Sequence, residues 1–258
     1  MTRIGERFAQ LRANGRAGFV GFVTAGDPSL ERTVEVAVGL EAAGVDVLEL
    51  GVPFSDPLAD GPVIQRASER ALARGVTLAG VLAAVRRIRS RSAIPLLLFS
   101  YFNPLWRFGL ERLAAEAQDA GIDGVLVTDL PPEEADEWLA VARRAELDTV
   151  FLAAPTSPPE RLARIAEASR GFVYAISRTG VTGEGATLSQ DAAPLLRALR
   201  QLTREPVALG FGLSTPAQVA EASALADAVV VGSSLVRFME EHPEGDLAAH
   251  VRWLKGTA

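Results

Sequence analysis

The sequence lacks cysteine and has very little histidine or lysine. Its 258 residues include two histidines, His242 and His250, and one lysine, Lys255, all near the C-terminus. The absence of cysteine excludes disulfide bonds and thiol catalysis, and it is typical of a cytosolic protein. A Ser-His-Asp triad or a histidine-rich zinc site needs histidine on the body of the fold. A Schiff base needs a buried lysine, and we expect Lys255 to lie in a frayed terminal segment.

If this chain is an enzyme, its proton transfer must therefore run through carboxylates, with tyrosine as the remaining helper. We expect no metal ion and no cofactor in the chain itself.

The sequence also lacks long apolar runs and clusters of positive charge. No apolar run reaches the roughly 18 residues that cross a membrane, and residues 1–6 lack the apolar core of a signal peptide. The net charge is −6 and the charges of both signs are interspersed, so the basic stripe that binds nucleic acid is missing. We predict a cytoplasmic protein that binds neither nucleic acid nor membranes.

Eight short apolar runs, each followed by a helical pattern, make up most of the chain. The runs do not alternate in polarity, which is typical of parallel strands buried on both faces. The predicted strands are 19–24, 46–51, 95–100, 124–128, 149–153, 172–176, 206–210 and 228–231. The predicted helices are 3–13, 29–43, 62–74, 77–90, 105–120, 132–145, 159–169, 189–202, 215–224, 234–241 and 246–254, with Ser214 capping the helix at 215.

Eight strand–helix units in about 250 residues predict an α/β fold of the (β/α)₈ TIM-barrel type. The helix at 3–13 and the additional helices extend that plan. A doubly wound open sheet is the alternative, because strand order cannot be read from sequence. No break in composition marks a second domain, so we expect residues 1–258 to form a single barrel domain.

One stretch, Val47-Leu-Glu-Leu-Gly-Val-Pro-Phe-Ser-Asp-Pro-Leu-Ala-Asp-Gly-Pro62, combines a strand with a proline-dense loop. Glu49 lies inside the apolar run between Leu48 and Leu50, and burial there should raise its pKa towards neutrality. Asp60 lies in the loop, which the prolines make stiff. Two such acids favour acid/base catalysis. The alternative is a strand-end glutamate that pairs with an arginine, and aspartates that only cap turns.

In a barrel, all strand ends at the carboxyl side open onto one face. Strand 206–210 leads into Gly210-Phe-Gly212, and strand 228–231 leads into Gly232-Ser-Ser234 just before a helix. A third loop, 177–186, is rich in glycine and threonine. Backbone N–H groups at such glycines and at the helix start favour a phosphate site, although any one of them alone could be only a tight turn.

Five aromatic residues stand at or near strand ends and either line a flat apolar pocket or fill the barrel core. They are Phe22, Phe99, Tyr101, Tyr174 and Phe211.

Three motifs together resemble the tryptophan synthase alpha chain family. They are Phe22-Val-Thr-Ala-Gly-Asp-Pro28, Leu48 to Pro62 of the stretch above, and Ser177-Arg-Thr-Gly-Val-Thr-Gly183. The resemblance runs from Phe8 to about Val236. It implies a lyase that cleaves indole-3-glycerol phosphate into indole and glyceraldehyde 3-phosphate, within an alpha2beta2 heterotetramer whose beta chain carries pyridoxal phosphate (PLP).

The resemblance also implies roles for individual residues, matched by motif. Glu49 falls at the position of the catalytic acid/base and Asp60 at that of the acid that stabilises charge on the indole nitrogen. The phosphate-binding positions are Gly183, Gly212, Gly232 and Ser233, and the positions around the substrate are Phe22, Tyr174 and Phe211. Thr182 lies in the loop that resembles the family's lid, and Asp129 lies in the loop that contacts it. Phe99 stands where we expect a smaller apolar residue.

Two other functions compete with the carboxylate lyase. The first is another phosphate-binding barrel, such as a sugar-phosphate isomerase or an indole-glycerol-phosphate-forming synthase. Such barrels usually place lysine, histidine or cysteine at strand ends, and this chain has none there. The second is a non-catalytic regulatory barrel, which would have no need for an acid at Glu49. The sequence therefore favours the lyase.

Overall fold

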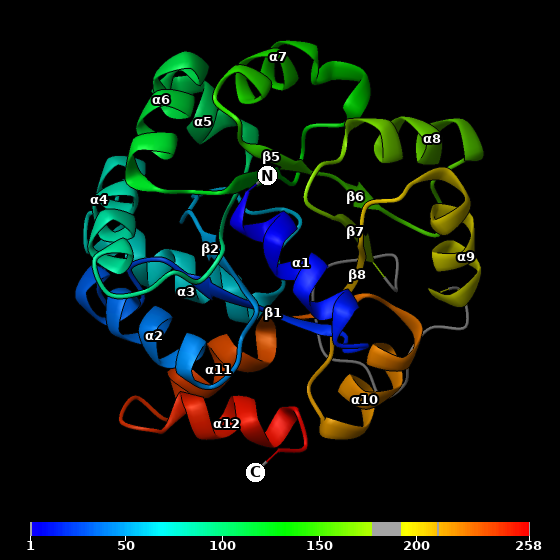
Figure 1. Cartoon of the computed structure of the whole chain (residues 1–258). Coiled ribbons are helices and arrows are strands. Elements are labelled where there is room, and N and C mark those ends of the chain that lie inside the picture. Colours follow the sequence, from blue (N-terminus) through cyan, green and yellow to red (C-terminus); the bar gives the residue numbers. More distant parts are fainter. Residues whose placement is uncertain (1, 177–191, 211, 258) are drawn as a thin grey trace.

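A ring of parallel strands surrounded by helices forms the centre of the structure (Figure 1). The computed structural model describes residues 2–176, 192–210 and 212–257. Its strands are β1 (Gly18–Thr24), β2 (Val47–Gly51), β3 (Leu96–Ser100), β4 (Gly124–Val127), β5 (Asp148–Val150), β6 (Leu152–Ala153), β7 (Val173–Ile176), β8 (Val207–Gly210) and β9 (Ala228–Val231). They follow the order β5-β4-β3-β2-β1-β9-β8-β7-β6.

The ring closes through the chain at Phe151. The two outermost strands in that order, β5 and β6, are consecutive in sequence and are separated by this residue alone. The predicted strand 149–153 is thus one barrel strand divided in two, whose first part pairs with β4 and whose second part pairs with β7. The predicted parallel barrel is confirmed, and the doubly wound open sheet is excluded because its edge strands would be distant in sequence.

Helices surround the ring, and the first of them in the chain lies across its end (Figure 1). They are α1 (Arg3–Ala13), α2 (Leu30–Ala42), α3 (Pro62–Ala73), α4 (Leu78–Arg89), α5 (Phe102–Phe108), α6 (Leu110–Ala120), α7 (Asp136–Arg144), α8 (Pro159–Ala168), α9 (Ala192–Leu202), α10 (Pro216–Leu225), α11 (Ser233–Glu241) and α12 (Leu247–Leu254), with a 3₁₀ turn at Pro132–Glu134. The predicted start of α9 at residue 189 lies outside the described residues.

Three helix predictions were wrong in detail. The helix predicted at 105–120 is two helices, because Gly109 adopts a φ of +92° that ends α5 and starts α6. The helix predicted at 132–145 begins with the 3₁₀ turn, and α7 starts only at Asp136. Thr215, and not Ser214, caps α10 through a reciprocal pair of hydrogen bonds with Gln218.

Helix α1 closes the end of the barrel at which the strands begin. It lies across the centre of the ring in Figure 1. Its buried residues Ile4, Phe8 and Leu11 pack with apolar side chains that several strands send into the barrel, among them Val20 and Val47. The N-terminal mouth of the barrel is therefore filled, and the opposite end is the one left for a site.

Aspartates at the N-terminal ends of the strands hold α1 in place. The fully buried carboxylate of Asp46 accepts hydrogen bonds from Arg7 and Arg16 at 2.7 Å and from the backbone N–H of Phe19 at 2.7 Å. Asp123 accepts from Arg3 at 2.9 Å. These acids are satisfied by cations and backbone donors, so they have structural roles.

Lys255 is not in a frayed tail, as its place in the sequence suggested. It is half-buried, its ammonium group donates to the carbonyl of Gly44 at 2.6 Å, and it lies 5.9 Å from the ring centroid of Phe19. Burial lowers its pKa. Both contacts are at the end where the strands begin, so Lys255 fastens α12 to the barrel. It lies away from the C-terminal strand ends, where Glu49 and Asp60 are found. Within the described residues, no helix has the length and apolar character that a membrane crossing requires.

Asp46, with the arginines Arg7 and Arg16 that bind it, should contribute strongly to stability at the end of the barrel where the strands begin, the barrel floor. We expect Asp46→Asn to lower the free energy of unfolding by about 3 kcal/mol, since it removes the buried charge that two arginines and a backbone donor share. Glu35→Gln, which breaks the exposed pair with Arg32, is the matched control and should cost less than about 0.5 kcal/mol. Urea unfolding of both variants measures this, and equal effects would contradict it.

Candidate active site

Glu49 projects into the barrel from β2. Side chains alternate along a strand: Leu48 and Leu50 pack in the layer between strands and helices, whereas Val47 belongs to the cluster inside the barrel. Glu49 shares the side of Val47 and lies in register with Phe22 on β1 and Leu97 on β3. It is thus one layer above the apolar floor, at the end where the strands finish.

The surroundings of Glu49 favour its neutral form. The residue is 1% exposed, and burial raises its pKa to about 8. Its Oε1 atom has no hydrogen-bond partner among the described residues. The predicted rise is confirmed, but its cause differs from the expected one: Leu48 and Leu50 point the other way, and the barrel interior desolvates the carboxyl group. The alternative, a glutamate paired with an arginine, is excluded for the described part of the chain.

Asp60 is held by the loop between β2 and α3. It is 7% exposed, and burial raises its pKa to about 6, partly offset by a hydrogen bond from the hydroxyl of Tyr101. The same hydroxyl accepts the backbone N–H of Ala59 at 2.9 Å. The side chain of Gln65 donates to the Asp60 carbonyl at 2.9 Å. Stiffness of the loop thus comes from these hydrogen bonds as well as from its prolines.

Both acids face one cavity at the C-terminal ends of the strands. The described residues that line it are Phe22, Glu49, Asp60, Ile64, Phe99, Tyr174, Gly212, Leu213, Val230, Gly232 and Ser233. Phe22 and Phe99 meet edge to face, with ring centroids 5.2 Å apart. Tyr174 packs so tightly on β8 that a Cβ at Gly210 would lie 2.3 Å from its hydroxyl oxygen. Of the five candidate aromatic residues, Phe22, Phe99 and Tyr174 line the cavity. Tyr101 is not among the lining residues, but its hydroxyl group donates a hydrogen bond to Asp60.

The far side of the cavity has the features of an anion site. Gly212 adopts a φ of +83°, which favours glycine. Gly232 precedes α11, and no side chain of the described residues caps the first turn of that helix. The N–H groups at the start of α11 are therefore open to a ligand, at the positive end of the helix dipole. A side chain at Gly232 would press on Phe22, 3.3 Å from its Cβ.

Three of the site residues predicted from sequence, Thr182, Gly183 and Phe211, lie outside the described residues. Asp129 is exposed and accepts the backbone N–H of Phe102. Sequence reasoning missed Ile64, Leu213 and Val230 as lining residues. Val230 lies in register with Val20, which points into the barrel, so the alternation of β9 could have found it. Nothing in the sequence singles out the other two.

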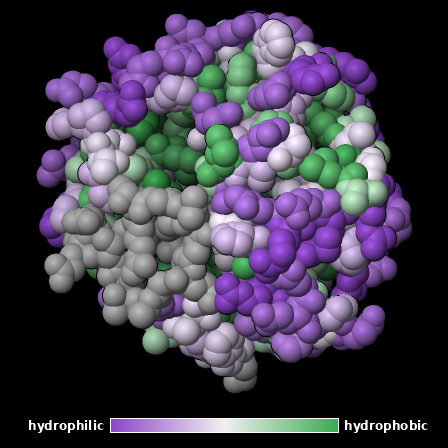
Figure 2. Space-filling model, turned by 180° about the vertical axis from the view of Figure 1, so that it is seen from behind, coloured by the Kyte–Doolittle hydropathy of each residue, from purple (hydrophilic) through white to green (hydrophobic). Residues whose placement is uncertain are grey.

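Figure 2 shows the molecule from behind, and apolar side chains gather in the upper part of that face. Larger cavities lie elsewhere, one of them, of about 670 Å³, beside the start of α1. That cavity has charged walls and includes Asp148, which accepts a hydrogen bond from Thr2. It is the smaller cavity at the strand ends that combines a buried acid whose Oε1 atom has no partner among the described residues, a second buried acid and a helix start that no described side chain caps.

A parallel (β/α)₈ barrel with buried carboxyl groups at the C-terminal ends of its strands defines the class of the protein, a TIM-barrel enzyme. The sequence pattern described as "Tryptophan synthase alpha chain" matches residues 8–255. The chain therefore belongs to the tryptophan synthase alpha chain family, and it is a carbon–carbon lyase of tryptophan biosynthesis.

Close relatives extend over almost the whole chain. The tryptophan synthase alpha chain of Solibacter usitatus is 53% identical over 244 residues, covering 95% of this chain and 91% of the relative. That of Geobacter sulfurreducens is 49% identical, covering 97% and 95%. Among solved structures, a chain of tryptophan synthase from M. tuberculosis has a TM-score of 0.90 at 39% identity, covering 100% and 98%. Tryptophan synthase subunit alpha from Legionella pneumophila has a TM-score of 0.88 at 37% identity, covering 100% and 97%.

The resemblance stated from three motifs is thus confirmed, and the match extends past Val236 to residue 255. The two competing functions, another phosphate-binding barrel and a regulatory barrel, are set aside.

The pKa of Glu49 makes stability depend on pH. Its carboxyl group titrates near 4.5 in the unfolded chain and near 8 in the folded protein. Between these values the folded state binds more protons, so this group's contribution to stability falls as pH rises. Glutamine cannot ionise, so the stability of Glu49→Gln lacks this pH dependence. The free energy of unfolding of Glu49→Gln relative to the wild type should therefore rise by on the order of a few kcal/mol from pH 5 to pH 9.

Urea unfolding of both proteins at pH 5 and pH 9 measures this, with Glu35→Gln, an exposed position, as the control. A difference between Glu49→Gln and the wild type that stays constant with pH would show that the carboxyl group is not desolvated.

Proposed function

We propose that this chain, folded as a single (β/α)₈ domain, cleaves indole-3-glycerol phosphate into indole and glyceraldehyde 3-phosphate, with Glu49 and Asp60 as its catalytic residues. The observation that carries the proposal is Glu49, a buried carboxyl group with a pKa of about 8 and an oxygen without a partner among the described residues. It faces a cavity that Asp60 also lines.

The reaction is a retro-aldol cleavage, and its protons balance within the substrate. The bond between indole C3 and the first side-chain carbon breaks, C3 gains a proton, and the hydroxyl group on that side-chain carbon loses one as it becomes an aldehyde. A single acid/base can perform both transfers in turn. With a pKa of about 8, Glu49 is mostly protonated at pH 7, so it starts as the acid and then accepts the hydroxyl proton.

Protonation at C3 puts positive charge on the indole ring nitrogen. Asp60, with a pKa of about 6, is mostly ionised at pH 7 and is suited to accept the ring N–H and stabilise that charge. Two carboxyl groups whose pKa values are pushed apart by their surroundings can thus divide the acid and the electrostatic roles.

The rest of the cavity supplies binding groups. The backbone N–H groups at Gly212, Gly232 and Ser233 would hold the phosphate, at the uncapped start of α11. Phe22 and Tyr174 would flank the indole and the side chain. Thr182, Gly183 and Phe211 complete this set in our proposal, on the strength of the sequence motifs alone.

Removing the acid/base should stop catalysis without removing binding. Glu49→Gln keeps the shape of the side chain, and we expect single-turnover release of indole to slow by roughly 10²–10⁴-fold, towards the upper end because one group serves both proton transfers. Asp60→Asn should be severe but leave more activity, because its amide oxygen can still accept the ring N–H. A Glu49→Gln protein that cleaves within a few-fold of the wild type would refute this mechanism.

We further propose that the chain works in the cytoplasm beside a beta chain, in an alpha2beta2 heterotetramer whose only cofactor is the PLP of the beta chain. Two exposed apolar side chains support a partner: Leu58 in the Asp60 loop is 85% exposed and Trp106 on α5 is 62% exposed. The two segments meet at Tyr101, which contacts Ala59 and the ring of Phe54 and directly precedes α5. A partner on this surface would press on the loop that holds Asp60.

Loss of these two side chains should weaken the complex. We expect Trp106→Ser to reduce affinity for a beta chain at least about tenfold, since exposed tryptophans at interfaces are often dominant contacts, and Leu58→Ser to act in the same direction. Leu202→Ser on α9, which removes another exposed leucine, is the control. Titration calorimetry with a purified beta chain measures the affinities. Equal affinity for all three variants would place the interface elsewhere.

A further inference from the structure

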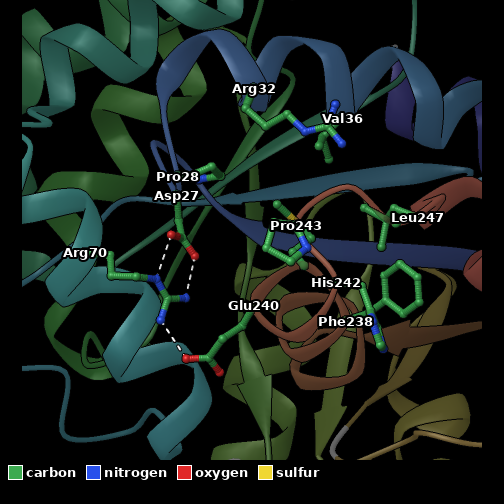
Figure 3. A pocket seen from close by; sticks show the side chains of 12 residues that line it. Asp27, Pro28, Arg32, Val36, Arg70, Phe238, Glu240, His242, Pro243 and Leu247 are labelled. Carbon is green, nitrogen blue, oxygen red and sulfur yellow. Dashed lines mark hydrogen bonds and ion pairs between the residues drawn. The ribbon is translucent and has the colours of Figure 1, made fainter.

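Arg70 on α3 joins two other elements at the edge of the site. Its guanidinium group donates two hydrogen bonds to Asp27, in the loop after β1, at 2.9 and 2.7 Å. It donates a third to Glu240 on α11 at 2.7 Å. Arg66, one turn earlier on α3, also donates twice to Glu240, at 2.9 and 2.7 Å. Figure 3 shows Arg70 between the two carboxylates.

An apolar contact joins the same three elements on the side of the cavity. Phe22 of β1 packs with Ile64 and Ala67 of α3 and with Val236 of α11. The two helices are thus held to each other twice, by side chains packed on Phe22 and by the arginine bridge. Of these two contacts, the arginine bridge sets the orientation of the helices. A guanidinium group that binds a carboxylate through two parallel hydrogen bonds fixes orientation as well as distance.

These helices begin at the two ends of the cavity. Helix α3 starts at Pro62, directly after the loop that holds Asp60, and α11 starts at Ser233 in the candidate phosphate site. Arg70 and Glu240 each lie roughly two turns along their helices. The bridge therefore links the helix that follows the indole end of the site to the helix that begins at its phosphate end.

We propose that Arg70 is a positioning residue that sets the distance between Asp60 and the phosphate site. The inference rests on the proposed function, in which one substrate spans both ends. A substrate held at both ends is sensitive to their spacing, and a misplacement of about 1 Å can lower the rate on the order of 100-fold. The Arg70 side chain is 35% exposed, but that of Asp27 is only 6% exposed, so loss of Arg70 leaves a buried charge unpaired and lowers stability as well. The test therefore compares the binding of ligands, which a purely structural role would weaken for whole and half ligands alike.

The test compares an intact ligand with its two halves. The intact probe is indole-3-propanol phosphate, which lacks the hydroxyl groups needed for cleavage, and the half-ligands are glycerol phosphate and indole. Arg70→Met keeps the apolar stem and removes the bridge. A cavity of about 200 Å³ beside the ion pairs leaves room for the new side chain. The control is Arg86→Met, which breaks a two-bond pair with Asp119 between α4 and α6.

We expect Arg70→Met to lower kcat/KM and to weaken binding of the intact probe by about tenfold or more. Binding of each half-ligand should stay within about twofold of the wild type, because neither half of the site is altered. Arg70→Lys should fall between, since one ammonium group cannot bridge two carboxylates in the same geometry. Glu240→Gln is a second variant that weakens the bridge from α11, should Arg70→Met fail to fold.

Two results would overturn the proposal. One is an Arg70→Met protein that matches Arg86→Met in kcat/KM and in affinity for the intact probe. The other is an equal loss of glycerol phosphate affinity, which would assign Arg70 to the phosphate end alone. The binding measurements need no turnover, so they remain decisive for Arg70 even if the wild type releases no indole. That outcome would instead refute the proposed function.

Discussion

A carboxyl group held inside an apolar barrel is the constraint on which the rest of the site depends. The barrel interior stabilises the neutral form of Glu49, as its pKa of about 8 indicates. The carboxyl group stays available because no described side chain pairs with its Oε1 atom. Closure of the ring through Phe151 and the filling of its other end by α1 surround that interior with packed apolar side chains. The raised pKa of Glu49 therefore depends on the closed barrel. A barrel that admitted water would hydrate the carboxyl group and return its pKa towards 4.5.

The two ends of the barrel use acidic residues in opposite ways. At the end where the strands begin, Asp46 is as buried as Glu49 but accepts hydrogen bonds from two arginines and a backbone N–H. Burial without such donors raises the pKa of Glu49 and, less strongly, that of Asp60. Hydrogen bonds from arginine thus distinguish Asp46 from Glu49, whose Oε1 atom has no partner among the described residues.

Strand positions, the barrel and the two catalytic candidates could all be predicted from sequence, because each follows from local pattern. Apolar runs define strands, glycine and proline end helices, and parallel strands bring their ends to one face. The side to which each residue points was harder. The sequence suggests that Leu48 and Leu50 desolvate Glu49, but alternation along β2 turns both outward. Alternation along β9 likewise places Val230 in the cavity.

Long-range pairing could not be predicted. Arg70, Asp27 and Glu240 belong to three segments that meet only in the folded chain, and the sequence around each is ordinary for a helix or a loop. Gly109 could not be interpreted from sequence for a more local reason. A glycine in a helical pattern either is tolerated within the helix or breaks it, and here it breaks the helix.

The anchoring of both chain ends at the floor of the barrel has a practical consequence. Helix α1 covers the mouth where the strands begin, and Lys255 ties the last helix to Gly44 just before β2. An affinity tag, a surface tether or a fused domain attached at either end would therefore sit on the far side of the molecule from Glu49. The chain can be immobilised by its ends with its reacting face turned outward, free for substrate and for a second protein.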